Sequence, residues 1–176
     1  MGKRIRVVVG AALLFLVCAT ATGAQGGRDI VAGAGTVMAD DATIHFSAGA
    51  SSEPDGSNPR GEVTLHAEIF GTTDTQFRGD VSNGCLIVNG KTALAVGELP
   101  ESERFVVPGA PPGSGPVRFV AVTVVDNGHP EIGQPADLAS GLLLFERTGL
   151  RACAGTFIPA AGPLTHGNFV VIDALP

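Results

Sequence analysis

The chain has 176 residues, of which 44% are hydrophobic, and its formal net charge is −6 at pH 7. This length supports one domain with one buried core, and the apolar content excludes a disordered chain despite 25 Gly and 12 Pro. The acidic balance argues against nucleic acid as a partner, because its phosphates would be repelled.

The first residues have the order of a secretory signal peptide. Positive residues come first, an apolar run follows, and small residues come last: Lys3, Arg4 and Arg6, then 7–17, then 19–24. We predict a signal peptide over residues 1–24 with cleavage after Ala24, and cleavage after Ala21 as the alternative. The mature chain is then a single secreted domain of residues 25–176.

The apolar run is too short for the roughly 20 residues that a membrane span requires. We therefore expect no stable membrane insertion after processing, and a retained anchor is the alternative. Cys18 has the place of a lipid-modified cysteine, but Leu16 and Val17 before it are bulkier than such a site favours. Lipidation is a further alternative.

Beyond the leader the hydrophobic pattern has a period of two, which predicts strands with one buried face. This alternation occurs in three segments, at 43–47, 62–69 and 76–81. Longer apolar runs predict strands covered on both faces, or nearly so, at 117–125, 142–145 and 169–172. We find no stretch with the spacing of an amphipathic helix.

Turn residues separate these segments. Asn89-Gly90 predicts a β-hairpin between 85–88 and 91–96, because such turns need positive φ. Further turns are predicted at three dipeptides, Asp40-Asp41, Asn83-Gly84 and Asn127-Gly128. About nine or ten short strands predict an all-β fold, a single antiparallel β-sandwich or small barrel, and the pattern does not choose between the two.

Cysteine use agrees with export. Cys85 and Cys153 remain after the leader is removed, and disulfides persist in the oxidising compartments that exported proteins reach. We predict a Cys85–Cys153 disulfide, with two separately buried thiols as the alternative.

Several segments together resemble a family of small secreted bacterial proteins of uncharacterised function. The matching pieces are 44–48, 61–64, 77–81 leading to 85–88, 122–128, Cys153 and 167–173. The resemblance implies a β-rich domain and supports the pairing of Cys85 with Cys153, but it implies no activity. Lys91 departs from the family pattern, where a turn-type Asn would follow Gly90.

Four histidines, His45, His66, His129 and His166, are candidate metal ligands or bases. His66 and Glu68 share one face of a predicted strand, but two ligands fall short of the four that structural zinc sites use. An exposed strand face normally carries polar residues at alternate positions, which explains the pair as well. We therefore predict no metal site and no cofactor.

Two other motifs are candidates for a catalytic serine and for a calcium site. Gly79 to Gly84 is similar to a nucleophile elbow around Ser82, but it has one residue too many before the serine and no helix after it. Oxygen ligands near Asp126-Asn127-Gly128, with Glu131 and Asp137, could hold calcium, but they lack the EF-hand order. A turn explains each motif, so no catalytic residue is predicted.

The sequence therefore favours an exported non-catalytic β-domain, a binding or structural module with an extracellular protein or glycan partner. A glycan site would lack its usual aromatic residues, because the chain has no Trp and no Tyr. Two alternatives remain: a carrier of a small apolar ligand, built as a barrel with a cavity, and a hydrolase with a Ser or an acid beside His66 or another histidine.

Overall fold

The computed structural model describes residues 27–39, 42–67, 75–128, 136–155 and 161–174. The elements in chain order are β1 (Asp29–Ala39), β2 (Ala42–Ser52), β3 (Arg60–Ala67), β4 (Thr75–Asn89), β5 (Thr92–Glu98), the 3₁₀ turn η1 (Glu101–Glu103), β6 (Val117–Val125), β7 (Leu138–Phe145), α1 (Glu146–Cys153), β8 (Gly162–Pro163) and β9 (His166–Ile172). These strands form one antiparallel sheet in the order β8-β7-β6-β5-β4-β3-β2-β1-β9. The all-β prediction is confirmed.

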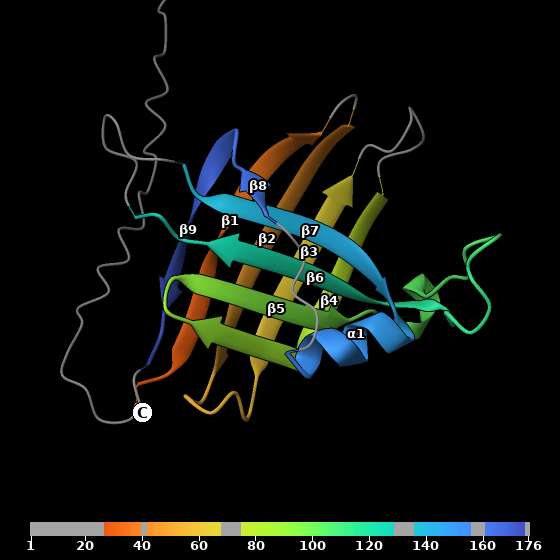
Figure 1. Ribbon diagram of the computed structural model, residues 1–176, viewed down its shortest axis with the longest axis horizontal. Coiled ribbons are helices and arrows are strands. Elements are labelled where there is room, and N and C mark those ends of the chain that lie inside the picture. The colour runs from red at the N-terminus through yellow and green to blue at the C-terminus, as the bar shows by residue number, and fades with distance from the viewer. Residues whose placement is uncertain (1–26, 40–41, 68–74, 129–135, 156–160, 175–176) are drawn as a thin grey trace, which may run out of the picture.

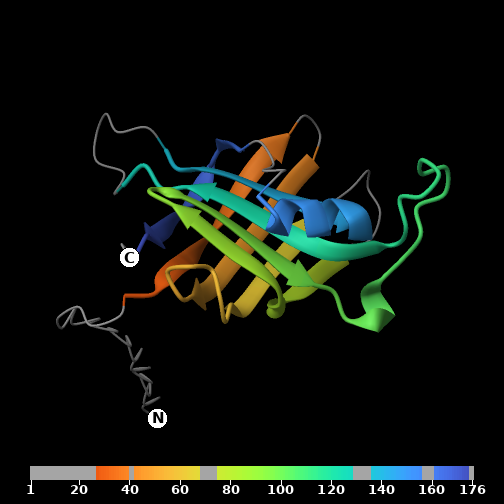
Figure 2. The same ribbon diagram turned by 60° about the horizontal axis from the view of Figure 1, so that its bottom comes forward.

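The sheet curls because β4 bends from one layer into the next. The first part of β4 pairs with β3, its last part pairs with β5, and the register shifts between Asp80 and Cys85. Such irregularities let a strand turn the corner between layers. Figure 1 shows the result, with β5, β6 and β7 crossing in front of β1, β2 and β3, and Figure 2 shows the crossing from another side.

The main core fills the space between the two layers. Val63 of β3 and Val120 of β6 are fully buried, and Phe46 of β2 stacks on Phe169 of β9 with ring centroids 6.0 Å apart. Gly141 of β7 leaves room for the side chains of Leu65 and Phe46. The alternation of hydrophobic and polar residues in the sequence agrees with this arrangement, because every second residue of a strand points inward.

Residues 162–172 join the two edges of the sheet. β8 pairs with β7, and β9, which follows almost directly, pairs with β1. The other edge of β9 has no strand partner among the described residues, and two carboxylates accept main-chain amides of β9 instead. Asp137 accepts the amide of Phe169 at 2.9 Å, and Asp126 accepts that of Val171 at 2.9 Å. We call these two residues the carboxylate seam.

A second, smaller core lies on the outer side of β5, β6 and β7, under α1. Leu94, Val96 and Phe119 are buried there against Ala152 of the helix. Helix α1 was not predicted from the sequence, because it has only eight residues and no side chain caps its first turn. Packing and the disulfide to β4 stabilise it instead of local propensity.

Two strand predictions were wrong in detail. The turn predicted at Asn83-Gly84 is the shifted part of the continuous strand β4. Strand β9 is covered on one face only, since Val170 and Ile172 are about half exposed. Coverage of nearly the whole strand on both faces, as predicted for 117–125, is confirmed, since all its residues but Arg118 and Val125 are buried. The hairpin is confirmed too, although its turn residues are Gly90 and Lys91.

Other expectations lie outside the described residues. These are the signal peptide at 1–24, the turn at Asp40-Asp41, and the residues Glu68, His129 and Glu131. Among the residues that the structure describes, no helix is long and apolar enough to cross a membrane.

Candidate functional site

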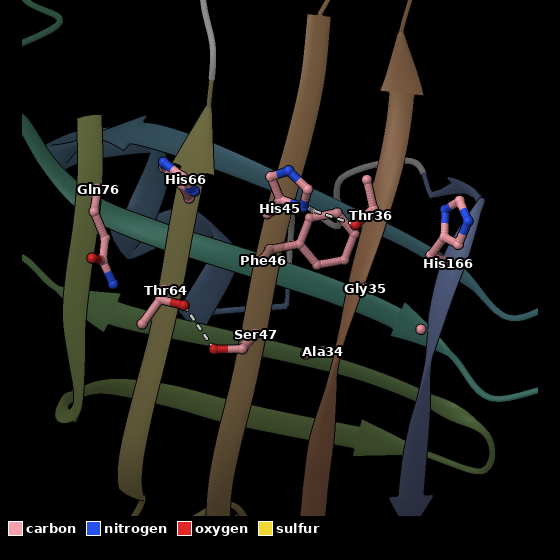
Figure 3. A pocket seen from close by; sticks show the side chains of 11 residues that line it. Ala34, Gly35, Thr36, His45, Phe46, Ser47, Thr64, His66, Gln76 and His166 are labelled. Atoms are coloured by element: carbon pink, nitrogen blue, oxygen red, sulfur yellow. Dashed lines mark hydrogen bonds between the residues drawn. The ribbon is translucent and has the colours of Figure 1, made fainter. Parts of the chain in front are cut away.

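Five polar side chains, three of them histidines, form a row across the outer surface of β9, β1, β2, β3 and β4. The strand register pairs His166 with Thr36, Thr36 with His45, His45 with His66, and His66 with Gln76. Directly paired residues project from the same face of a sheet. We call these five residues the histidine row, and Figure 3 shows them along one side of the sheet.

A surface hollow of about 440 Å³ follows this row. Small residues form part of its floor, among them Ala34, Gly35 and Gly167. Its polar groups are imidazoles, hydroxyls and an amide, so they both donate and accept hydrogen bonds. The hollow therefore offers hydrogen-bonding groups to a ligand above a floor of small residues.

Contacts within the hollow fix two of its side-chain pairs. Thr36 Oγ1 lies 2.8 Å from His45 Nδ1, and Ser47 Oγ lies 2.7 Å from Thr64 Oγ1 (Figure 3). The rings of His45 and His66 are 5.7 Å apart between centroids and are tilted by 31°. These contacts reduce the rotamer freedom that a ligand would otherwise have to restrict.

The same surface becomes apolar toward the other end of the strands. Val170 pairs with Ala32 and Ile172 pairs with Ile30, and this register places all four side chains on the face of the histidine row. Gly49 lies next to Ala32, and a Cβ added at Gly49 would meet nothing within 4 Å. A second hollow of about 340 Å³ lies here. We call the outer surface of β9, β1, β2, β3 and the first part of β4 the open face.

A charged groove of about 510 Å³ borders the open face near η1. Glu98 accepts hydrogen bonds from Arg104 at 2.7 Å and from Arg118 at 2.8 Å, and Arg118 also reaches Glu146. The bond to Glu98 raises the pKa of Arg118 above its ordinary value, which keeps this guanidinium charged. Each strong charge of the network has an opposite charge beside it, so we interpret the network as structural.

The other sequence candidates are found elsewhere. Ser82 lies inside β4 rather than on an elbow, and its amide donates to Asp80 Oδ1 at 2.8 Å. Asp126 and Asp137 accept main-chain amides with all four carboxylate oxygens, which makes them structural acceptors. Over the described ranges, no group of three or more His, Cys, Asp or Glu side chains is placed to hold a metal ion.

Helix α1 covers much of the remaining outer surface, although Leu142 of β7 is 39% exposed there. Cys85 of β4 and Cys153 of α1 form a disulfide with Cα atoms 5.6 Å apart, which attaches the helix over β5, β6 and β7. This pairing is as the sequence predicted. The histidine row was missed, because a shared row depends on strand register, which the sequence pattern left undetermined.

Comparisons with protein-family models, curated proteins and solved structures found no match for this chain. The resemblance to small secreted bacterial proteins therefore stays a prediction.

Proposed function

We propose that this chain is an exported, non-catalytic β-domain that binds another protein through its open face. The observation that carries the proposal is the asymmetry of the outer surface. On one half, α1 and the Cys85–Cys153 disulfide cover most of the apolar side chains, whereas no helix of the described residues lies over the paired strands of the open face.

The size of the open face agrees with a protein partner. Strands lie about 4.8 Å apart and rise about 3.4 Å per residue, so five strands over seven residues present roughly 600 Å². A standard interface buries about 800 Å² on each partner. Adjoining loops would supply the remainder.

The chemistry of the open face also agrees with a protein partner. Val170 and Ile172 are 47% and 48% exposed and lie on the same face as the polar histidine row, toward the other end of the strands. Protein interfaces combine an apolar centre with hydrogen-bonding groups around it. A glycan site would instead favour aromatic platforms, and Trp and Tyr do not occur in the sequence.

Nothing comparable supports the apolar carrier. Such a carrier needs interior space, and the region between the layers is occupied by side chains such as Phe46, Val120 and Phe169. Among the described residues, the hollow at the histidine row, the hollow beside Gly49 and the groove near η1 are all open at the surface.

The test places a photo-crosslinking residue at position 49 of the exported chain and identifies the captured protein by mass spectrometry. That protein is then purified, and its affinity is measured for the wild type and for Gly49→Arg. Position 49 is solvent-exposed on the open face and has space for a side chain. Gly162→Arg is the matched control, since a Cβ there also meets nothing within 4 Å but lies on β8.

We expect Gly49→Arg to weaken binding at least about tenfold, which corresponds to about 1.4 kcal/mol, and Gly162→Arg to leave it unchanged. Equal binding by both variants would overturn the assignment to the open face. A captured polysaccharide in place of a protein would overturn the class of partner.

A further inference from the structure

We propose that His45 and His66 bind one divalent transition ion, Zn²⁺ or Cu²⁺, on the open face. The two residues are direct cross-strand partners on β2 and β3. Their rings lie on the same side of the sheet at the hollow that Figure 3 shows. This site is independent of the protein partner proposed above.

The ring spacing fits a shared ion. A metal–nitrogen distance of about 2.1 Å and a tetrahedral angle place the centroids of two bound imidazoles about 5.3 Å apart. The observed separation is 5.7 Å. The two rings are therefore at the separation that a shared ion requires, and the site needs side-chain torsions that turn one nitrogen of each ring toward that ion.

Thr36 orients one of the two ligands. Its Oγ1 lies 2.8 Å from Nδ1 of His45, and when Nδ1 donates this bond, Nε2 carries the lone pair that a metal needs. Hydrogen bonds of this kind to the second ring nitrogen fix the tautomer and orientation of metal-bound histidines. Thr36 is thus a positioning residue for the site.

The chemistry of the pair selects the ion. Imidazole nitrogen suits Zn²⁺ and Cu²⁺, whereas Ca²⁺ and Mg²⁺ prefer oxygen ligands. His45 is exposed and the hollow of about 440 Å³ has room for water, which would complete the coordination. Such a site keeps open positions and would accept a further ligand from outside the chain.

The test uses the mature chain without a polyhistidine tag and titrates it with ZnCl₂ in a calorimeter. We expect saturable binding of one ion by the wild type. His45→Ala and His66→Gln should each weaken it at least about tenfold, since each removes one of the two protein ligands. Thr36→Val, which removes only the orienting hydroxyl, should weaken it about tenfold.

His166→Ala is the matched control. His166 lies in the same row, but Thr36 separates it from His45 in the register, so its loss should leave the affinity unchanged. A second readout adds Cu²⁺ and follows the imidazole signals by NMR, where paramagnetic broadening should appear first at His45 and His66. Absence of saturable binding by the wild type would overturn the proposal. Equal loss in the His166 variant would overturn it as well.

Discussion

Removal of the Asp137 carboxylate should open the carboxylate seam that holds β9. Asp137 is 5% exposed, and its two oxygens accept the amides of Asn127 and Phe169 at 2.9 Å each. Phe169 is a core residue that is 1% exposed. In Asp137→Ala, both amides lose their acceptor, and the Phe169 amide stays out of reach of water unless β9 moves.

The expected cost follows from these two amides. Leaving a buried donor without a partner costs about 1–3 kcal/mol, so Asp137→Ala should lower the free energy of unfolding by about 4 kcal/mol, close to the combined penalty. Asp137→Asn keeps one oxygen but turns an amide group toward the second donor. It should therefore cost about 2 kcal/mol, near half as much.

Urea denaturation of residues 25–176 measures both costs, and amide hydrogen exchange locates them. Exchange should accelerate at Phe169 before it does so at Val63, which lies in the centre of the core. If Asp137→Ala costs less than about 1 kcal/mol, the amides have found other acceptors. In that case the seam does not contribute as we argue.

Three further predictions concern stability. Cys85→Ser should cost about 2–5 kcal/mol, because the disulfide to Cys153 closes a loop with a sequence separation of 68; an unchanged urea midpoint would contradict this. Burial raises the pKa of Asp29, so the folded state holds its proton more tightly than the unfolded state and stability falls as pH rises through the folded pKa. Asp29→Asn should therefore raise the melting temperature at pH 7 and flatten its dependence on pH, and a lower melting temperature at pH 7 would refute this. Gly61→Ala should cost at least about 2 kcal/mol, since φ is 123° there and a Cβ would strike the backbone of Gly49, whereas Gly49→Ala should melt like the wild type.

Local pattern predicted the parts of the fold in which local and tertiary preferences agree. The apolar run at 117–125 became β6, because a strand between two covered faces needs no alternation. The Asn89-Gly90 signal placed the hairpin to within one residue, since Gly90 adopts a φ of 58° that other residues avoid. The pairing of Cys85 with Cys153 could be predicted because these are the two cysteines that follow the predicted signal peptide.

Features that depend on tertiary context could not be predicted. Helix α1 has little local support and forms because Gly149 and Ala152 fit against the sheet. Asp137 reads as a surface loop residue in the sequence, but the return of β9 past it makes it a buried acceptor. The distance between His45 and His66 along the chain gives no hint that they share a row.

Stability and binding can be altered separately, because α1 and the open face occupy different halves of the outer surface. Helix α1 and Cys85 protect Leu94 and Val96 of β5, whereas His45 lies on β2, in the layer that β5 crosses. Loss of the disulfide would weaken the covered half first, because the disulfide attaches the last turn of α1 to β4. The register of β1, β2 and β3 is maintained by their own ladder and by the core beneath them. Variants of the disulfide should therefore change the melting temperature without changing the Zn²⁺ affinity of the part that still folds. His45→Ala and His66→Gln should instead lower that affinity without changing the melting temperature.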